Sequence, residues 1–416
     1  MSVNSADARY RGTTPRQHGA MEFSDAPVDL HKVREYRLGR LREQLRRLDY
    51  AGILMFDQVN TRYATDATNM QIWCSHYETR CVFVATEGPV VVFDYMYLPH
   101  IAEDLPLIDE YRAMSSFHYF TAAERGEERV KEFAAEIGDL VTQHGGGNKR
   151  LAIDRLSHMG VEALKSQGIE PKEGLEVTEL ARVIKSPEEL VLMQKSMEVC
   201  EAGIAAMHEA LEPGITENAL WAKLHETNIR LGGEWIETRL LSSGPRTNPW
   251  FRECSMRAIE KGDMVCFDTD LVGPYGYCSD ISRGWVCDSA PNDEQRRLYA
   301  AAYEQLQHNI SLLKAGKAFR EVSEQAWPIP DEFHAHRYGS VGHGIGLADE
   351  YPSVKHWDVY EAKGYEGVFE ENMVFCVEAC IGAVGGRECI KLEEQVMITD
   401  QGPRLMSSYP LHDDWV

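Results

Sequence analysis

The sequence predicts an α+β protein of two domains, an α/β domain followed by a domain richer in strands. Three observations support this prediction. Apolar strand patterns alternate with amphipathic helix patterns over residues 31–184. A strong helix-start signal then occurs at Ser186, and short strand patterns separated by turn residues dominate after two long helices in residues 185–416. The chain length of 416 residues is also sufficient for two or three domains.

The elements of the first domain follow a polar segment. Residues 1–30 lack periodicity, which predicts an arm that is flexible or that orders only against a partner. Beyond the arm, helices have apolar residues three and four positions apart, and buried strands are bounded by glycine and proline. The predicted elements are a helix at 30–50, strands at 51–57 and 81–94, a helix at 124–143 ended by glycines 145–147, and a strand at 151–156.

The second domain opens with an unusually complete set of helix signals. Ser186 is a predicted N-cap, Pro187 occupies the first helical position, and Glu189 completes a capping box. The long helix that follows is expected to end at Pro213–Gly214. Two further helices are predicted, one after Thr216 that ends at Gly232–Gly233 and one over residues 293–313.

Composition and charge argue against several classes of function. The formal net charge is −23, so a nucleic-acid partner is not expected, whereas a small cationic substrate would be attracted; the alternative interpretation is solubility alone. No segment has the roughly 18 uninterrupted apolar residues of a membrane span, so no membrane partner is expected. The first 20 residues lack the apolar core of a secretory signal, and the ten cysteines form no C-x-x-C pair. A cytoplasmic enzyme with reduced thiols is therefore expected.

Three carboxylates are predicted to converge across a hairpin. Asp268 and Asp270 lie two positions apart on a predicted strand, so their side chains should face the same side. The loop at Gly273–Gly276 turns the chain back, and Asp280 then lies on the neighbouring strand. Since three carboxylates repel one another, a bound cation is the simplest stabiliser.

Three further positions extend this pattern. His343 lies between glycines that leave its imidazole accessible, and Glu378 and Glu393 each lie in an apolar strand. Singly, each has an ordinary interpretation, such as a structural histidine or a glutamate paired with Lys or Arg. Together, oxygen ligands and one imidazole suit two divalent transition ions such as iron, manganese, cobalt or zinc. Such a pair acts as a Lewis acid in hydrolysis or proton abstraction.

The order of these motifs resembles that of the creatinase, prolidase and methionine aminopeptidase superfamily. The resemblance also covers Lys185–Glu189 and the Pro213–Glu217 turn, and extends over nearly all of the chain after residue 30. It implies a creatinase-like N-terminal domain at 31–184, a pita-bread catalytic domain at 185–416, and a homodimer in which one N-terminal domain covers the other active site. The implied metal ligands are an aspartate of the pair Asp268 and Asp270, then Asp280, His343, Glu378 and Glu393.

Several motifs depart from the peptidase pattern. Asp268-Thr-Asp270 replaces the usual Asp-x-Gly, Asp349 replaces a histidine before Glu-x-Pro, and Trp250 replaces another histidine after Asn248-Pro249. The two histidines that peptidases use around the scissile amide are therefore missing. This altered set resembles the dimethylsulfoniopropionate lyases of the same superfamily. That resemblance implies β-elimination of dimethylsulfoniopropionate to dimethyl sulfide, acrylate and a proton.

The expected mechanism places the carboxylate of this zwitterionic substrate on the metal pair, for which iron is favoured. Asp349 is expected to be the base, although a turn-forming role is the alternative. The sulfonium is expected to contact aromatic faces at Tyr338 and Trp250, and at Trp73 if a partner chain closes the site. His343 is expected either to ligate metal or to border the substrate. Core packing is the alternative for each aromatic residue, and it is favoured for Trp73.

Two competing functions stay open at this point. A prolidase- or creatinase-like C–N hydrolase would need the missing histidines. A catalytically inactive binding module would be expected to lose metal ligands, which are retained here.

Overall fold

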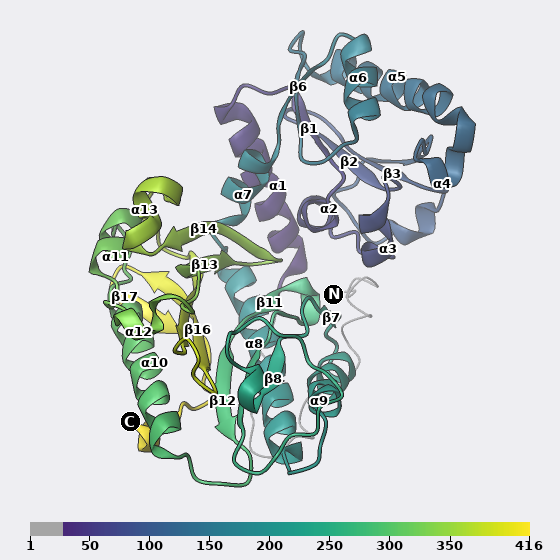
Figure 1. Ribbon diagram of the computed structural model, residues 1–416. Coiled ribbons are helices and arrows are strands. Elements are labelled where there is room, and N and C mark those ends of the chain that lie inside the picture. The colour runs from purple at the N-terminus through teal and green to yellow at the C-terminus, as the bar shows by residue number, and fades with distance from the viewer. Residues whose placement is uncertain (1–27) are drawn as a thin grey trace. The chain divides into compact units, whose positions relative to one another are not determined.

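The computed structural model describes residues 28–416, so the predicted arm at residues 1–30 lies almost wholly outside the described residues. The described chain divides into two compact units, Asp29–Arg182 and Val183–Val416 (Figure 1). Within residues 28–416, none of the helices combines the length and apolar character needed to cross a membrane.

The first unit contains a six-stranded mixed sheet in the order β4-β3-β2-β1-β5-β6. Its central strands β1, β2 and β3 are buried along their whole length, which explains their continuous apolar sequences. The strands are β1 (Gly52–Met55), β2 (Cys81–Ala85), β3 (Val90–Asp94), β4 (Glu110–Ala113), β5 (Arg150–Ile153) and β6 (Glu170–Glu173). The helices are α1 (Leu30–Arg47), α2 (Gln58–Thr65), α3 (Gln71–His76), α4 (Tyr119–Ala122), α5 (Gly126–His144), α6 (His158–Ser166) and α7 (Leu175–Arg182).

The second unit begins with the helix that its capping signals predict. Ser186 accepts a hydrogen bond from the Glu189 amide, and the Glu189 side chain accepts one from the Ser186 amide, so the capping box is formed. Thr216 likewise caps the next helix. The helices are α8 (Pro187–Ala210), α9 (Glu217–Arg230), α10 (Asp293–Ser311), α11 (Phe319–Gln325), α12 (Asp331–His334) and α13 (Trp357–Lys363).

Three sheets follow α9 in this unit, in the orders β11-β10-β7, β12-β9-β8 and β14-β13-β15-β16-β17. The main apolar core lies between α10 and the largest sheet, where side chains such as Leu298 and Phe375 are fully buried. The strands are β7 (Trp235–Ile236), β8 (Leu241–Ser243), β9 (Met264–Asp268), β10 (Leu271–Val272), β11 (Cys278–Ser279), β12 (Ser282–Val286), β13 (Ser340–Ile345), β14 (Asp349–Lys355), β15 (Val374–Ile381), β16 (Ile390–Thr399) and β17 (Gly402–Leu405).

Candidate metal centre

The three predicted aspartates do converge, but not on one regular hairpin. Strand β9 ends at Asp268, and Asp270 adopts a left-handed backbone conformation with φ of 35° before β10 begins in a different sheet. The Asp270 amide donates to Asp280 Oδ1 at 3.1 Å, which stabilises the bend. One carboxylate oxygen from each of Asp268, Asp270 and Asp280 lies within 4.8 Å of the others. The expectation of a continuous strand through Asp270 is therefore wrong, while the expected cluster is present.

The two glutamates lie opposite each other on neighbouring strands. Glu378 on β15 and Glu393 on β16 are a directly paired residue couple, and both are almost fully buried. Like charges in such a pair are destabilising unless a cation intervenes. Together with Asp268 they form a second group whose oxygens lie within 4.8 Å of one another.

A buried lysine, which the sequence analysis did not single out, contacts all three members of that second group. Lys391 Nζ lies 2.9 Å from Asp268 Oδ2, 2.5 Å from Glu378 Oε2 and 2.8 Å from Glu393 Oε2. Burial alone would lower the pKa of Lys391, but the three carboxylates raise it well above its usual value. The pairing of these glutamates with a lysine, left as the ordinary interpretation of the sequence, therefore occurs within the same cluster.

His343 on β13 joins the acidic cluster from the next strand. Its Nε2 lies 3.1 Å from Glu378 Oε1 and 3.8 Å from Glu393 Oε1. Burial acts to lower the pKa of His343, but Glu378 and Asp349 raise it to about 9. A third group that could hold a metal consists of His343 with Asp280, Cys376 and Glu393. The register of β13 and β15 places Cys376 opposite His343, which explains its position in this group.

The donor set fits divalent metal ions. Glu393 Oε1 is buried without a hydrogen-bond partner among residues 28–416, as expected for an oxygen that awaits a ligand. Burial and repulsion from Asp268 raise the pKa of Asp270 to about 7, and a bound cation would favour its ionised form. Carboxylates with one imidazole match iron, manganese, cobalt or zinc, whereas thiolate-rich sites favour softer ions.

Asp349 lies at the edge of this cluster, at the start of β14. Its Oδ1 is 3.6 Å from His343 Nδ1, and its side chain is 53% exposed. Desolvation by the surrounding protein raises the pKa of Asp349, and the His343 charge partly opposes this. A half-exposed carboxylate with a raised pKa is suited to accept a proton from a bound molecule.

The aromatic residues divide into one beside the cluster and two elsewhere. The Tyr338 ring centroid lies 5.0 Å from Lys391 Nζ, so this ring borders the acidic group. Trp250 is only 6% exposed and belongs to the main apolar core. Its neighbour Phe251 is 59% exposed, and its ring centroid lies 5.5 Å from that of Tyr338; the sequence analysis did not single out Phe251. Trp73 belongs to the first unit, where it contacts Tyr95 at 5.3 Å.

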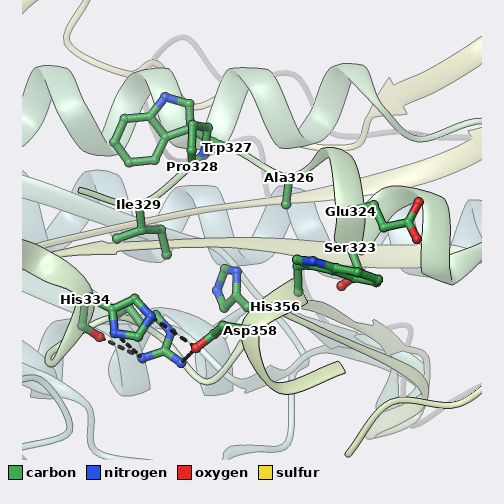
Figure 2. A pocket seen from close by; sticks show the side chains of 11 residues that line it. Ser323, Glu324, Ala326, Trp327, Pro328, Ile329, His334, His356 and Asp358 are labelled. Atoms are coloured by element: carbon green, nitrogen blue, oxygen red, sulfur yellow. Dashed lines mark hydrogen bonds and ion pairs between the residues drawn. The ribbon is translucent and has the colours of Figure 1, made fainter. Parts of the chain in front are cut away.

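A separate hollow of about 260 Å³ lies among α11, α12 and α13 (Figure 2). Trp327 and Trp357 line it together with His356. Arg337 at its edge donates hydrogen bonds to Asp358 and to the His334 carbonyl. The hollow contains none of the acidic residues of the metal cluster, so the candidate chemistry lies elsewhere.

Comparison with known proteins supports the family that the sequence motifs predict. Residues 191–400 match the model of metallopeptidase family M24, and residues 37–186 match the creatinase/prolidase N-terminal domain. The chain is 44% identical to dimethylsulfoniopropionate lyase DddP of Roseovarius nubinhibens, over 92% of this chain and 87% of that protein. The chain belongs to the DddP family within metallopeptidase family M24. It is also 41% identical to the DddP of Roseobacter denitrificans, over 95% of this chain and 91% of that protein.

Solved structures confirm the fold of this DddP family member. The Xaa-Pro dipeptidase of Bacillus anthracis superposes with a TM-score of 0.73 at 20% identity, covering 91% of this chain and 98% of that one. The prolidase of Pyrococcus horikoshii OT3 gives a TM-score of 0.71 at 21% identity, covering 90% and 99%. The predicted creatinase-like and pita-bread architecture and the predicted lyase family are therefore confirmed.

Proposed function

We propose that this DddP family member is a metal-dependent carbon–sulfur lyase that cleaves dimethylsulfoniopropionate to dimethyl sulfide and acrylate. The observation that carries the proposal is Asp349 beside an intact acidic cluster, in a chain whose relatives named DddP are lyases. Asp268, Asp270, Asp280, His343, Glu378 and Glu393 would hold two divalent ions, with iron favoured. When bound, these ions supply Lewis acidity that polarises the substrate carboxylate and stabilises charge on it.

Asp349 would carry out the proton transfer. Its carboxylate takes the proton from the carbon next to the substrate carboxylate, a double bond forms, and the C–S bond breaks with its electrons remaining on sulfur. The leaving group is a neutral thioether, so no acid is needed on that side. The raised pKa of Asp349 brings its basicity closer to neutral pH, which favours this transfer.

The sulfonium end would be held by aromatic faces and by negative charge. Tyr338 borders the acidic cluster through its contact with Lys391, and the Phe251 ring contacts Tyr338. Each ring that contacts a cation contributes about 0.5–2 kcal/mol, depending on how dry the contact is. Trp250 was also predicted to contact substrate, but its burial favours the alternative role in the core.

A homodimer is proposed from the surface of the first unit. Several large apolar side chains there are exposed on or near α3 and α4, which is more than scattered exposure would explain. Trp73 lies within this group through its ring contacts with Tyr77 and Tyr95. A second copy that covered this surface would bring Trp73 to the site of its partner. The exposed residues are Met70, Ile72, Tyr77, Met96, Tyr97, Tyr119 and Phe120.

A cytoplasmic location is proposed from the thiols. All ten cysteines of the chain are free and buried in the structure. Free thiols in this number suit a reducing compartment, where disulfides are rare.

The central experiment measures dimethyl sulfide in the headspace over purified, iron-loaded protein supplied with dimethylsulfoniopropionate. Asp349→Asn should reduce the rate at least a hundredfold, because the amide cannot accept the proton, while metal content by mass spectrometry stays at the wild-type level. Tyr338→Phe is the matched control, since it keeps the aromatic face and should retain most of the activity. A wild-type protein that releases no dimethyl sulfide but cleaves Xaa-Pro dipeptides would overturn the proposal.

A further inference from the structure

Lys391 is a fixed positive charge inside the candidate metal centre. The residue is completely buried on β16, two positions before Glu393. Beyond its three carboxylate contacts, Nζ donates to Ser282 Oγ at 2.9 Å. A buried ammonium surrounded in this way is held in one place, unlike a lysine that can reach solvent.

The charges of the cluster balance in a simple way when Lys391 is included. The groups that could hold metal contain five carboxylates, from Asp268, Asp270, Asp280, Glu378 and Glu393. With all five ionised and His343 neutral, as they would be when they hold metal, one ammonium leaves about four negative charges, which two divalent ions neutralise. Without the lysine, two divalent ions would leave one buried negative charge uncompensated, and such a charge is costly.

Lys391 also contacts only one of the two oxygens of each carboxylate partner. It takes Oδ2 of Asp268 and Oε2 of Glu393, while Asp268 Oδ1 accepts from Ser282 Oγ at 2.6 Å. The remaining Oε1 of Glu393 has no hydrogen-bond partner within the described part of the chain. These contacts orient the three carboxylates and leave Glu393 Oε1 available for a metal.

We propose that Lys391 is a positioning residue that acts as the built-in counter-charge of the metal centre. It orients Asp268, Glu378 and Glu393 before metal binds, and it limits the net negative charge of the cluster to the amount that two divalent ions neutralise. This inference rests on the metal centre of the proposed function and goes beyond the ligand set. It stabilises the metal-free protein by reducing the repulsion among the buried carboxylates, and it weakens the attraction of the site for each ion.

The test is the affinity for Mn²⁺ of chelator-stripped protein, measured by competition with a chelator of known affinity, together with the melting temperature. In Lys391→Met the metal-free protein should melt at a lower temperature, because three buried carboxylates lose their cation. Mn²⁺ should bind about tenfold or more tightly, since the repelling charge a few ångströms away is gone. The rise in melting temperature on adding Mn²⁺ should exceed that of the wild type. Unchanged or weaker Mn²⁺ binding by a folded Lys391→Met protein would overturn the proposal.

Two further variants separate charge from packing. Lys391→Arg keeps the charge and should retain the wild-type Mn²⁺ affinity within about threefold; a gain in affinity as large as that of the methionine variant would contradict the role of charge. Arg80→Met is the matched control, because Arg80 is also fully buried and pairs at 2.7 Å with Asp94 in the first unit, and neither residue belongs to the metal groups. It should lower the melting temperature without tightening Mn²⁺. If Lys391→Met does not fold, Lys391→Gln is measured against the same outcomes.

The outcome is independent of the lyase assay. Wild-type protein that binds two ions but releases no dimethyl sulfide would contradict the proposed function and leave the role of Lys391 intact. If the wild-type enzyme is active but the methionine variant binds Mn²⁺ no more tightly than the wild type, the proposed function stands and the role of Lys391 is contradicted.

Discussion

His356 follows β14 and caps α13, and its imidazole reaches into the hollow that contains none of the metal ligands (Figure 2). The residue is 5% exposed, and its Nε2 has no hydrogen-bond partner among residues 28–416. Desolvation by burial lowers the pKa of His356 to about 4, and the nearby Arg337 acts in the same direction. Asp358 opposes both, but Arg337 already occupies its carboxylate.

At this residue scale the sign of the pH dependence follows from the lowered pKa. Between pH 4 and 6.5 the unfolded chain binds a proton at His356 that the folded chain does not, so stability falls as the pH falls through that range. The loss reaches about 3 kcal/mol at most. We expect His356→Gln to flatten the pH dependence of the free energy of unfolding between pH 6.5 and 4.5, measured by urea titration. His334→Gln, an exposed neighbour, serves as control, and an equal slope in both variants and the wild type would contradict the prediction.

At the scale of single elements, α8 shows how far local sequence signals determine structure. The Ser186 side chain accepts from the Glu189 amide at 3.1 Å, and both residues are buried. We expect Ser186→Ala to lower the free energy of unfolding by about 1 kcal/mol, or more because the orphaned amide is buried. Chemical denaturation measures this, and Ser186→Thr should retain most of the stability because it keeps the hydroxyl. A neutral Ser186→Ala would show that the cap contributes nothing.

The same element scale shows where sequence reasoning stops. Helix caps and buried strands depend on residues near one another in the chain, so the start of α8 and the presence of buried strands within residues 81–94 could be predicted. The left-handed bend at Asp270 could not, because its cause is a hydrogen bond to Asp280 ten residues away. Phe251 likewise reaches Tyr338 through tertiary packing, whereas the sequence analysis expected Trp250 to contact the substrate.

Lys391 is an intermediate case, because one signal for it was present. Residues two apart on a strand share a face, so Lys391 and Glu393 were bound to point the same way once β16 was assigned. The contact with Asp268 and Glu378 still required the fold, since both lie on other strands.

At the scale of the whole molecule, the two units differ in whether they contain the candidate metal groups. The apolar core of the first unit contains none of the residues of the metal groups, whereas the second unit contains all of them. Any ligand that binds only the folded state stabilises it, by about 2.7 kcal/mol when present at 100 times its dissociation constant. Metal should therefore stabilise the second unit directly.

Removal of metal should consequently loosen one unit selectively. We expect chelation to lower the melting temperature and to speed amide hydrogen exchange in residues 264–286 and 374–399, which contain β9, β12, β15 and β16. Residues 81–94 in the first unit should exchange at an unchanged rate, because Phe83, Val91 and Phe93 pack in an apolar core that contains no residue of the metal groups. Hydrogen exchange with mass spectrometry measures both regions in one experiment, and re-addition of Mn²⁺ should restore protection. Equal loss of protection in both regions would contradict the prediction, since the acidic cluster repels itself within the second unit alone once its ions are gone.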